Sequence, residues 1–430
     1  MSSKGTDYRV NAAANASPAS PSVKKSHADL NPKTTHYEFL GPYGALAVTV
    51  GTPLTTYFLY FFVSPSDAPV FSVTALTIYF NWFTLLVFLW YILPGKVVQG
   101  TELRNGDRLT YKMNGLQSLA VVLVLVSAGL ALDPTFLEPL VTYFLPLITA
   151  SLIVSVSLAA WSYYVSCNRN ELLAEGGNSG AFVYDFFIGR ALNPRVGSFD
   201  VKVFCELRPG LFLWLLLDLA FLIHQYLTLH RVTDSMVLVV AFQGWYVVDS
   251  VWNESAVLST MDVTTDGFGF MLAFGDLTWV PFTYSLQARY LASHPVDLGL
   301  LSFVVLAIQF LGYHIFRSAN SQKDRFRNDP GHPSVRDLRS IATSRGTKLL
   351  ADGWWGSARH INYFGDWIMA WAWCLPTASG NPLTYFYVVY FGVLLLHRER
   401  RDEEKCAKKY GDDWVAYKKV VPWRIIPYIY

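Results

Sequence analysis

The sequence predicts an all-α, polytopic integral membrane protein with about ten transmembrane helices. Its composition, its long apolar stretches and the placement of its positive charges each indicate this fold class. Of the 430 residues, 52% are hydrophobic and only 15% are charged. A soluble domain carries about 25% charged residues, because its surface faces water. The shortage of charge indicates that much of this protein's surface faces lipid.

Long apolar stretches occur from residue 39 onward. A helix needs about 20 mostly apolar residues to cross the hydrocarbon core of a bilayer. The last two stretches are separated by only a few residues and predict a tight helical hairpin. The predicted spans are residues 39–64, 70–93, 114–132, 140–165, 209–229, 236–257, 268–286, 297–316, 361–378 and 382–396.

The positive charges provide an independent check on these spans. If the N-terminus is cytoplasmic, all but two of the 34 Lys and Arg residues fall in cytoplasmic segments, the exceptions being Arg231 and Arg289. Cytoplasmic loops of membrane proteins are enriched in Lys and Arg, and an incorrect number of spans would destroy the bias. The pattern therefore predicts an even number of helices, with both termini in the cytoplasm.

The N-terminal segment 1–36 is rich in Ala, Ser, Pro, Asn and Lys, and we expect a disordered cytoplasmic tail. It shows no pattern of a cleavable signal peptide, so the first membrane helix is expected to act as the insertion signal. The four cysteines, Cys167, Cys205, Cys374 and Cys406, are sparse and are predicted to be free thiols.

Ionisable groups within predicted spans mark candidate functional positions, because charge is costly in the membrane. Asp249 and Glu254 lie in the sixth predicted span, in the sequence QGWYVVDSVWNE, beside Trp245, Tyr246 and Trp252. These carboxylates could pair with other groups or reach the headgroups from a helix end. Their polar and aromatic neighbours favour a polar cavity instead.

The connection 317–360 is the longest predicted cytoplasmic loop and is strongly basic. Lys323 and Arg327 are four residues apart, so they would share one face of a helix. Two such cations could hold a diphosphate or a ribose phosphate, or they could face anionic lipid. From spacing alone, the lipid interpretation is favoured.

The C-terminal sequence HRERRDEEKCAKKYGDDWVAYKK is too polar to cross a membrane. If it is helical, Asp402, Cys406, Lys409 or Tyr410, and Tyr417 form a stripe. An interfacial helix would place large apolar side chains on such a stripe, whereas these groups form hydrogen bonds. The pattern therefore favours a surface that faces a ligand.

Motifs of soluble enzymes are missing from the chain. The stretch GFGFML at 267–272 begins like a dinucleotide-binding loop, but Leu272 stands where the third glycine belongs. There is no P-loop, HExxH motif, paired CxxC motif or serine-hydrolase elbow, and we predict neither a metal site nor a nucleic-acid partner. The motifs alone leave open a membrane enzyme or a transporter.

Four longer passages resemble the signatures of the sterol reductase family. They occur in the family's order, and the likeness extends from Tyr37 to the C-terminal VPWRIIPYIY. The passages are GAFVYDFFIGRALNPR at 180–195, GFGFMLAFGDLTWVPFTYSLQARYL at 267–291, LLADGWWGSARHINYFGD at 349–366 and LLHRERRDEEKCAKKYGDDW at 395–414.

Two N-terminal passages, YEFLGPYGALAVTVGTP and LPGKVVQGTELRNGDRLTYKMNGLQS, most resemble the branch of the family that reduces sterols at carbon 14. Neighbouring branches act at carbon 7 or at the 24(28) double bond and stay open as alternatives. The last third of the chain also resembles isoprenylcysteine methyltransferases. A membrane methyltransferase and a non-enzymatic sterol-binding scaffold are the alternatives from other classes.

The resemblance implies NADPH as the cofactor, bound by the C-terminal portion. Lys323 and Arg327 would then contact the phosphates. The remaining residues that match the family's cofactor-binding motifs are Leu350, Trp355, Asn362, Tyr363, Asp402, Cys406, Ala407, Lys408, Lys409, Tyr410 and Tyr417.

An isolated alkene does not accept hydride, so the implied reaction needs protonation before reduction. For a 14(15) double bond, the proton goes to carbon 15 and the hydride to carbon 14. A buried carboxylic acid can remain protonated near neutral pH in apolar surroundings. Aromatic faces, here Trp245, Trp252 or Tyr246, could stabilise the cation, although plain core packing explains them equally well. The candidate acids are Tyr246, Asp249, Glu254 and Asp402.

The predicted organisation has three parts: the tail 1–36, helices one to eight with the sterol pocket at 37–316, and the cofactor-binding portion 317–430. The pocket is expected between spans five to eight and the C-terminal helices. The family and its substrate imply a multi-pass protein of the endoplasmic reticulum membrane. A sterol taken from the bilayer, membrane lipid and other enzymes of the sterol pathway are the expected partners.

Overall fold

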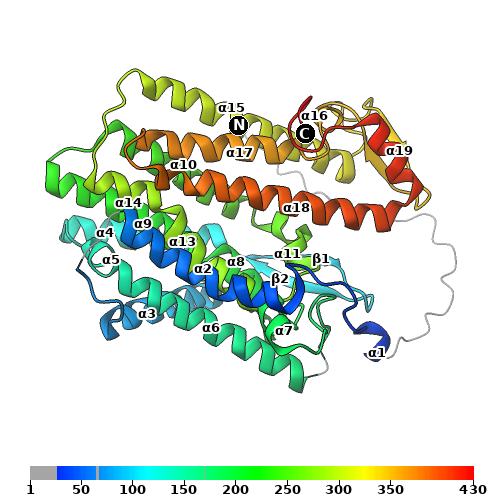
Figure 1. Cartoon of the computed structure of the whole chain (residues 1–430), viewed down its shortest axis with the longest axis horizontal. Coiled ribbons are helices and arrows are strands. Elements are labelled where there is room, and N and C mark those ends of the chain that lie inside the picture. The colour runs from blue at the N-terminus through cyan, green and yellow to red at the C-terminus, as the bar shows by residue number, and fades with distance from the viewer. Residues whose placement is uncertain (1–26, 64–66, 170) are drawn as a thin grey trace, which may run out of the picture.

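A computed structural model describes residues 27–63, 67–169 and 171–430. Long helices make up most of the molecule and run in roughly one direction (Figure 1). In the upper part of that view, α15 (Leu301–Asn328), α17 (Ile361–Cys374) and α18 (Phe386–Tyr410) lie side by side. The N-terminal helices occupy the lower part, so the C-terminal helices form a layer of their own.

Seven helical segments are long and apolar enough to cross a membrane, among the residues that the structure describes. This agrees with a multi-pass membrane protein. The bounds of the helices in these segments are α2 Gly41–Val63, α3 Val73–Ile92, α4 Gly115–Leu132, α6 Phe144–Asn168, α8 Val201–Leu207 with α9 Pro209–Leu229, α10 Asp234–Trp252 and α15.

The other three predicted spans differ from long, uniform helices. The seventh is a succession of short helices: α12 (Phe270–Phe274), the π-helical turn η2 (Gly275–Trp279), α13 (Val280–Tyr284) and α14 (Leu286–Ser293). Its interruptions are consistent with the Gly and Pro residues in this stretch. The ninth corresponds to α17 with the 3-10 turn η3 (Leu375–Thr377). The tenth corresponds to the 3-10 turn η4 (Pro382–Tyr385) with the first half of α18.

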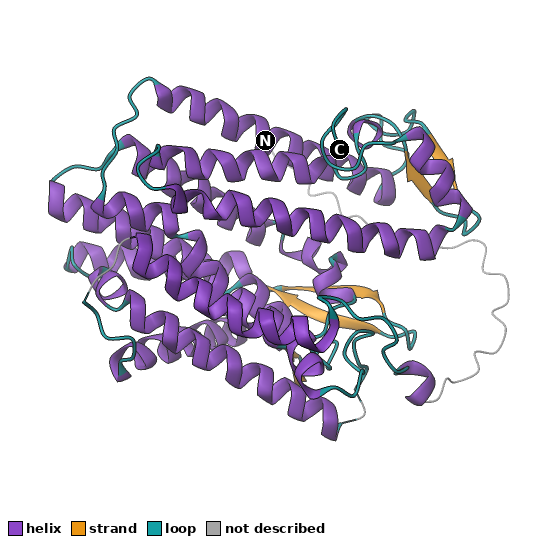
Figure 2. Ribbon diagram, viewed as in Figure 1, coloured by secondary structure: helices purple, strands orange, loops and turns teal. Residues whose placement is uncertain are grey.

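Three short antiparallel hairpins correct the purely helical prediction. In Figure 2, β1–β2 and β5–β6 lie toward the same end of the molecule. The paired strands are β1 Lys96–Glu102 with β2 Arg108–Met113, β3 Arg195–Val196 with β4 Phe199–Asp200, and β5 Ser340–Ala342 with β6 Lys348–Leu350. The remaining short helices are α1 His27–Leu30, α5 Glu138–Thr142, α7 Phe182–Ile188, the 3-10 helix η1 Glu254–Ser259, α11 Met261–Thr264, α16 Trp354–Ser357 and α19 Asp412–Val420.

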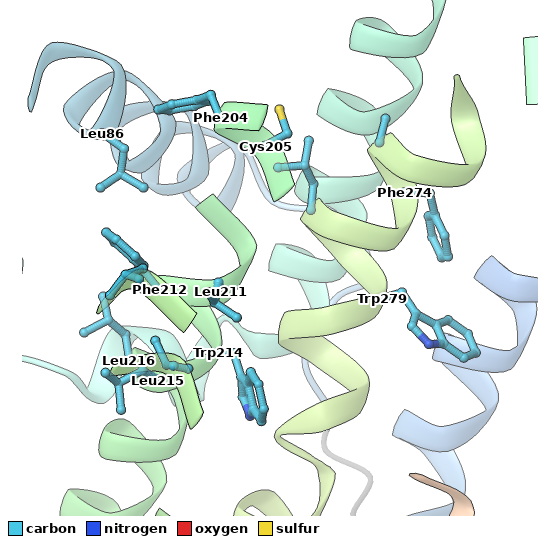
Figure 3. Packing of buried hydrophobic residues seen from close by; sticks show 14 of the residues in the cluster. Leu86, Phe204, Cys205, Leu211, Phe212, Trp214, Leu215, Leu216, Phe274 and Trp279 are labelled. Atoms are coloured by element: carbon cyan, nitrogen blue, oxygen red, sulfur yellow. The ribbon is translucent and has the colours of Figure 1, made fainter. Parts of the chain in front are cut away.

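Apolar and aromatic side chains of the central helices form the largest buried cluster. In Figure 3, Leu86 of α3 and Phe204 of α8 lie on the side of the cluster where Phe212 of α9 also packs. Trp214 of α9 is completely buried, and its indole Nε1 donates to Gln243 Oε1 of α10 at 3.0 Å. The polar indole nitrogen is thus satisfied inside an otherwise apolar core.

The close packing of α15 against α17 depends on two glycines. A Cβ atom at Gly312 would lie 2.7 Å from the carbonyl oxygen of Gly365, and one at Gly365 would lie 2.6 Å from the backbone nitrogen of Phe316. Small residues let membrane helices approach backbone to backbone. This contact sets the spacing between the two helices that carry Lys323 and Asn362.

A buried ion pair joins α4, α9 and η1. Arg208 at the start of α9 contacts Glu254, and the exposed fractions of these residues are 2% and 6%. Glu254 Oε2 accepts from the Gly115 backbone N–H at 2.8 Å, so the carboxylate occupies the first turn of α4. Arg208 also donates to Asn114 Oδ1 at 3.0 Å. These contacts favour a structural role for Glu254.

The predicted disordered tail needs a correction at its C-terminal part; residues 1–26 lie outside the described residues. Residues 27–30 form α1, and Asn31 Oδ1 accepts from the Leu173 backbone N–H at 2.8 Å. Asn178 donates back to the Asn31 carbonyl at 2.9 Å. Side-chain amides satisfy backbone groups of a distant loop, which sequence composition does not reveal. All four cysteines are free, as predicted.

We predict that Gly312→Val separates α15 from α17. The added methyl groups would overlap backbone atoms of α17, and overpacking typically costs about 1–3 kcal/mol. The expected result is a lower midpoint of thermal unfolding in detergent. Gly51→Val in α2 is the matched control, because a Cβ there meets no atom within 4 Å. Equal midpoints for the two variants would contradict the role of the contact.

We predict that Glu254→Gln destabilises the protein by about 3–5 kcal/mol, because it leaves the Arg208 charge buried without its partner. Thermal or denaturant unfolding in detergent measures the loss. Glu102→Gln is the control, since its side chain is 62% exposed and pairs with Arg108 on the surface. A change of less than about 0.5 kcal/mol in both variants would show that the buried pair is dispensable.

Candidate functional site

The candidate cofactor residues come from six elements of the C-terminal portion. Lys323 and Arg327 lie on the last turns of α15, Leu350 on β6 and Trp355 on α16. The remaining residues lie on α17, α18 and α19. Because α15, α17 and α18 pack side by side, residues separated by up to 94 positions in the sequence lie at one end of this layer (Figure 1).

Lys323 lies over an aromatic platform. Its Nζ is 3.8 Å from the centroid of the Trp355 ring, a cation–π contact. The Trp355 indole Nε1 donates to the Ala319 carbonyl of α15 at 2.8 Å, and the side chain is buried. The indole is therefore fixed to the helix that carries the lysine, one turn away. This arrangement holds the ammonium in place without neutralising its charge.

His360, which precedes α17, connects the platform to α18. Its Nδ1 lies 3.9 Å from Asp402 Oδ2, and its ring stacks on Tyr363 with centroids 5.0 Å apart. Burial, with the nearby positive charges of Lys323 and Arg359, lowers the pKa of His360 to about 3. Above that pH the imidazole is neutral, so its contact with Asp402 is not an ion pair at neutral pH.

Asn362 presents an acceptor toward this region. Its Nδ2 donates to Asn320 Oδ1 at 3.3 Å. Its own Oδ1 is buried and has no hydrogen-bond partner within the described ranges. A buried acceptor without a partner costs about 1–3 kcal/mol unless a ligand or water supplies a donor. An amide or amino group of a nucleotide cofactor fits this requirement, so the residues present are compatible with NADPH.

Only some residues of the predicted C-terminal stripe lie close to one another. Cys406 and Tyr410 pack against the buried Trp414 and Tyr417, in a cluster that also contains Ala351. Burial raises the pKa of the Cys406 thiol to about 11 and that of the Tyr417 hydroxyl to about 12. Both groups are therefore protonated at neutral pH and can donate hydrogen bonds.

The rest of the predicted run at 406–410 is exposed. Ala407, Lys408 and Lys409 are exposed, and Lys408 lines a cleft that it shares with Arg401 and Lys405. Consecutive residues of a helix point in different directions, so a run of five cannot all face one ligand. Whether these three residues bind the cofactor remains a prediction.

The side chains of the candidate acids in the sixth predicted span point toward different helices. Tyr246 packs against the rings of Trp214 and Trp373, with centroids 6.0 and 5.2 Å away. Asp249 faces α15: its Oδ1 accepts from the Tyr313 hydroxyl at 3.2 Å, and its Oδ2 lies 3.6 Å from Arg317. Glu254 faces α4 and α9. The structure therefore does not bring Asp249 and Glu254 into one cavity.

The two tryptophans considered for cation stabilisation lie on the outer surface. Trp245 and Trp252 are 52% and 71% exposed. The aromatic groups around Tyr246 come instead from other helices. Tyr284 of α13 and Tyr387 of α18 pack edge to face at 4.6 Å, and Tyr387 stacks on Trp373 at 5.3 Å. Sequence reasoning missed these rings, because only the packing of α10, α13, α17 and α18 places them together.

Arg398 was also missed by the sequence analysis. It lies one turn before Asp402 on α18, and its guanidinium donates to Asp262 Oδ2 at 2.8 Å. Its positive charge also acts on Tyr363 and Asp366 of α17. The four-residue spacing between Arg398 and Asp402 was the available signal, since it places both on one helix face.

Comparison with known proteins places this arrangement in a family. Residues 66–430 match the model of the "Ergosterol biosynthesis ERG4/ERG24 family". The chain is 53% identical over 412 residues to the Delta(14)-sterol reductase erg24 of Schizosaccharomyces pombe, covering 92% of this chain and 97% of that protein. It is 47% identical over 438 residues to the Delta(14)-sterol reductase ERG24 of Saccharomyces cerevisiae, covering 93% and 99%.

A further relative is the Delta(14)-sterol reductase ERG24 of Candida albicans, 45% identical over 449 residues, with 93% of this chain and 99% of that protein covered. The family match extends from the end of the first membrane helix to the last residue, and these relatives align over nearly their whole lengths. This chain belongs to the ergosterol biosynthesis ERG4/ERG24 family.

Proposed function

We propose that this protein reduces the C14=C15 double bond of a sterol-biosynthesis intermediate, with NADPH as the reductant. The observation that carries the proposal is the near full-length similarity, at 45–53% identity, to three proteins named Delta(14)-sterol reductase. The geometry adds a basic and aromatic platform at Lys323, an acceptor at Asn362 that has no partner among the described residues, and the carboxyl group of Asp402, all within one region of the C-terminal layer.

In this proposal, Lys323 and Arg327 bind the phosphates of the cofactor. They lie four residues apart on the polar end of α15, so both can face the same ligand. Trp355 keeps the ammonium of Lys323 oriented, and Arg327 can make bidentate contacts to phosphate oxygens. Asn362 supplies the acceptor, and Tyr363 with His360 forms a stacked pair beside it. When bound, NADPH supplies the hydride.

Tyr246 and Asp402 are the proposed proton donors. The other two candidates are engaged with donor groups: Glu254 accepts from Gly115 and contacts Arg208, and Asp249 accepts from Tyr313 beside Arg317. The oxygens of both carboxyl groups are already engaged by these protein groups, which favours a structural role for both. Tyr246 and Asp402 lack such an arginine pair within the described residues.

Exclusion of water is the remaining requirement, since a carbocation would otherwise be captured as an alcohol. The buried rings of Trp214, Trp373 and Tyr387 around Tyr246 support a dry environment. A sterol is apolar enough to enter from the bilayer between the helices. The soluble cofactor would approach from the polar end of α15 and α18.

The proposed topology has ten crossings, with α12–α14, α17 and α18 added to the seven long apolar segments. Both termini would be cytoplasmic, which the distribution of Lys and Arg supports. A membrane-embedded sterol substrate favours the endoplasmic reticulum as the location.

We predict that the purified protein reduces a 14(15)-unsaturated sterol in the presence of NADPH. Mass spectrometry should show deuterium from labelled NADPH at carbon 14 and solvent deuterium at carbon 15. Matched reactions contain 7-unsaturated and 24(28)-unsaturated sterols. Turnover of one of these instead would assign the protein to another branch, and no reduction of any sterol would refute the proposal.

We predict that the double change Lys323→Ala with Arg327→Ala raises the KM for NADPH at least about tenfold. Charge-assisted hydrogen bonds contribute about 1.5–3 kcal/mol each, and 1.4 kcal/mol corresponds to a tenfold change. Arg325→Ala is the control, because Arg325 lies on the same helix and its guanidinium contacts Ser334. An unchanged KM in the double variant would rule out these residues as the phosphate site.

We predict that Tyr246→Phe and Asp402→Asn each lower kcat by about 10²-fold or more, the usual contribution of a general acid. NADPH binding, measured by fluorescence titration, should persist in Tyr246→Phe. Asp249→Asn is the comparison on the same helix, and we expect a smaller loss of kcat. Full activity of Tyr246→Phe and Asp402→Asn, with an inactive Asp249→Asn, would move the acid to Asp249.

A further inference from the structure

Arg401 of α18 forms contacts with two distant segments. Its NH2 and NH1 groups donate to the two carboxylate oxygens of Asp266 at 2.6 and 3.1 Å. Its Nε donates to Glu38 Oε1 at 3.0 Å. Glu38 lies three residues before α2, the first long helix, and Asp266 lies two residues after α11. One guanidinium thus connects α18 to two segments that lie 135 and 363 residues away in the sequence.

The three side chains form a partly buried cluster. The exposed fractions of the side chains are 17% for Arg401, 4% for Asp266 and 28% for Glu38. The contact with Asp266 is bidentate, the geometry that orients a guanidinium most strictly. An exposed ion pair would contribute little, but a bidentate pair with a buried carboxylate restricts the helix it belongs to.

A second ion pair joins α18 to the segment that contains Asp266. It lies one turn earlier on α18, where Arg398 pairs with Asp262 at 2.8 Å. Asp262 and Asp266 are four residues apart, and Arg398 and Arg401 are three apart. Two arginines of one helix therefore contact two acids of one connecting segment. Two contact points fix both the position of α18 along its axis and its rotation about that axis.

The rotation of α18 decides where Asp402 points. Adjacent residues of an α-helix differ by about 100° in direction, because a turn contains 3.6 residues. With Arg401 directed toward Asp266 and Glu38, Asp402 points toward His360, at 3.9 Å. Arg401 itself lines a cleft together with Lys405 and Lys408. Arg401 is therefore adjacent in sequence to Asp402 but points in a different direction.

We propose that Arg401, held by Asp266 and Glu38, is a positioning residue that sets the rotation of α18 and so aligns Asp402 for proton transfer. This inference rests on the proposed function. Arg401 touches neither substrate nor cofactor in this proposal and acts only through Asp402. Loss of the guanidinium removes two of the contacts that fix this rotation, those with Asp266 and Glu38. A displacement of about 1 Å at a reacting group can cost 10²-fold in rate.

The test compares Arg401→Gln with Arg400→Gln in the full-length protein in lipid nanodiscs. Arg400 is the matched control, since it is exposed and no ion pair is found for it among the described residues. We expect kcat of Arg401→Gln to fall at least tenfold, with the KM for the sterol within about threefold of wild type. Arg401→Lys, which keeps the charge, should recover part of the loss.

The solvent deuterium isotope effect on kcat separates positioning from simple stabilisation. A misaligned proton donor makes proton transfer more rate-limiting, so the isotope effect should rise in Arg401→Gln. If the substitution only reduces the fraction of folded protein, the isotope effect on kcat stays equal to that of wild type. An unchanged isotope effect would therefore overturn the proposal. Equal kcat values for Arg401→Gln and Arg400→Gln would also overturn it.

A wild-type protein that reduces no sterol would refute the proposed function, and amide hydrogen exchange then tests the positioning role separately. Arg401→Gln should exchange faster than Arg400→Gln across residues 398–410, because α18 loses its contacts with Asp266 and Glu38. Identical exchange in the two variants would overturn the inference, whatever the reaction of the protein.

Discussion

The arrangement of the candidate site depends on how the polar half of α18 is held. Its arginines pair with Asp262 and Asp266, while Glu399 and Glu403 pair with Arg424 and Lys418 near the C-terminus. These pairs lie on different faces of the helix, because Glu399 and Glu403 are four residues apart and share a face that is turned away from Arg398 and Arg401. A helix that forms ion pairs on several faces can neither slide nor rotate freely. These ion pairs therefore fix the positions of Asp402 and Cys406.

The membrane imposes a second constraint on the fold. Polar groups within apolar surroundings need partners, and the observed partners explain where the acids of the sixth span point. Glu254 pairs with Arg208, and Asp249 contacts Tyr313 and Arg317. Tyr246 is left facing the aromatic rings of neighbouring helices. These three residues lie close together in the sequence, yet the side chain of each has different surroundings.

Close helix packing connects these two constraints. The glycines at 312 and 365 bring α15 against α17, which places the Lys323–Trp355 platform beside His360 and Asn362. His360 stays neutral because burial and the nearby cations disfavour its charged form, so it does not compete with Lys323 for anions. The layer formed by α15, α17 and α18 thus offers fixed positive charge at one end and neutral hydrogen-bonding groups beside it.

The sequence by itself determined the membrane class, most of the long helices and the C-terminal residues of the candidate cofactor site. Hydrophobic length and charge asymmetry are local properties of the chain, and the family motifs named Lys323, Trp355 and Asp402 directly. Only the tertiary structure decided that Asp249 and Glu254 face different helices, that Trp245 and Trp252 lie outside, and that Arg401 reaches Glu38. The direction of a side chain relative to a distant segment depends on helix rotation and packing, which no local pattern in the sequence records.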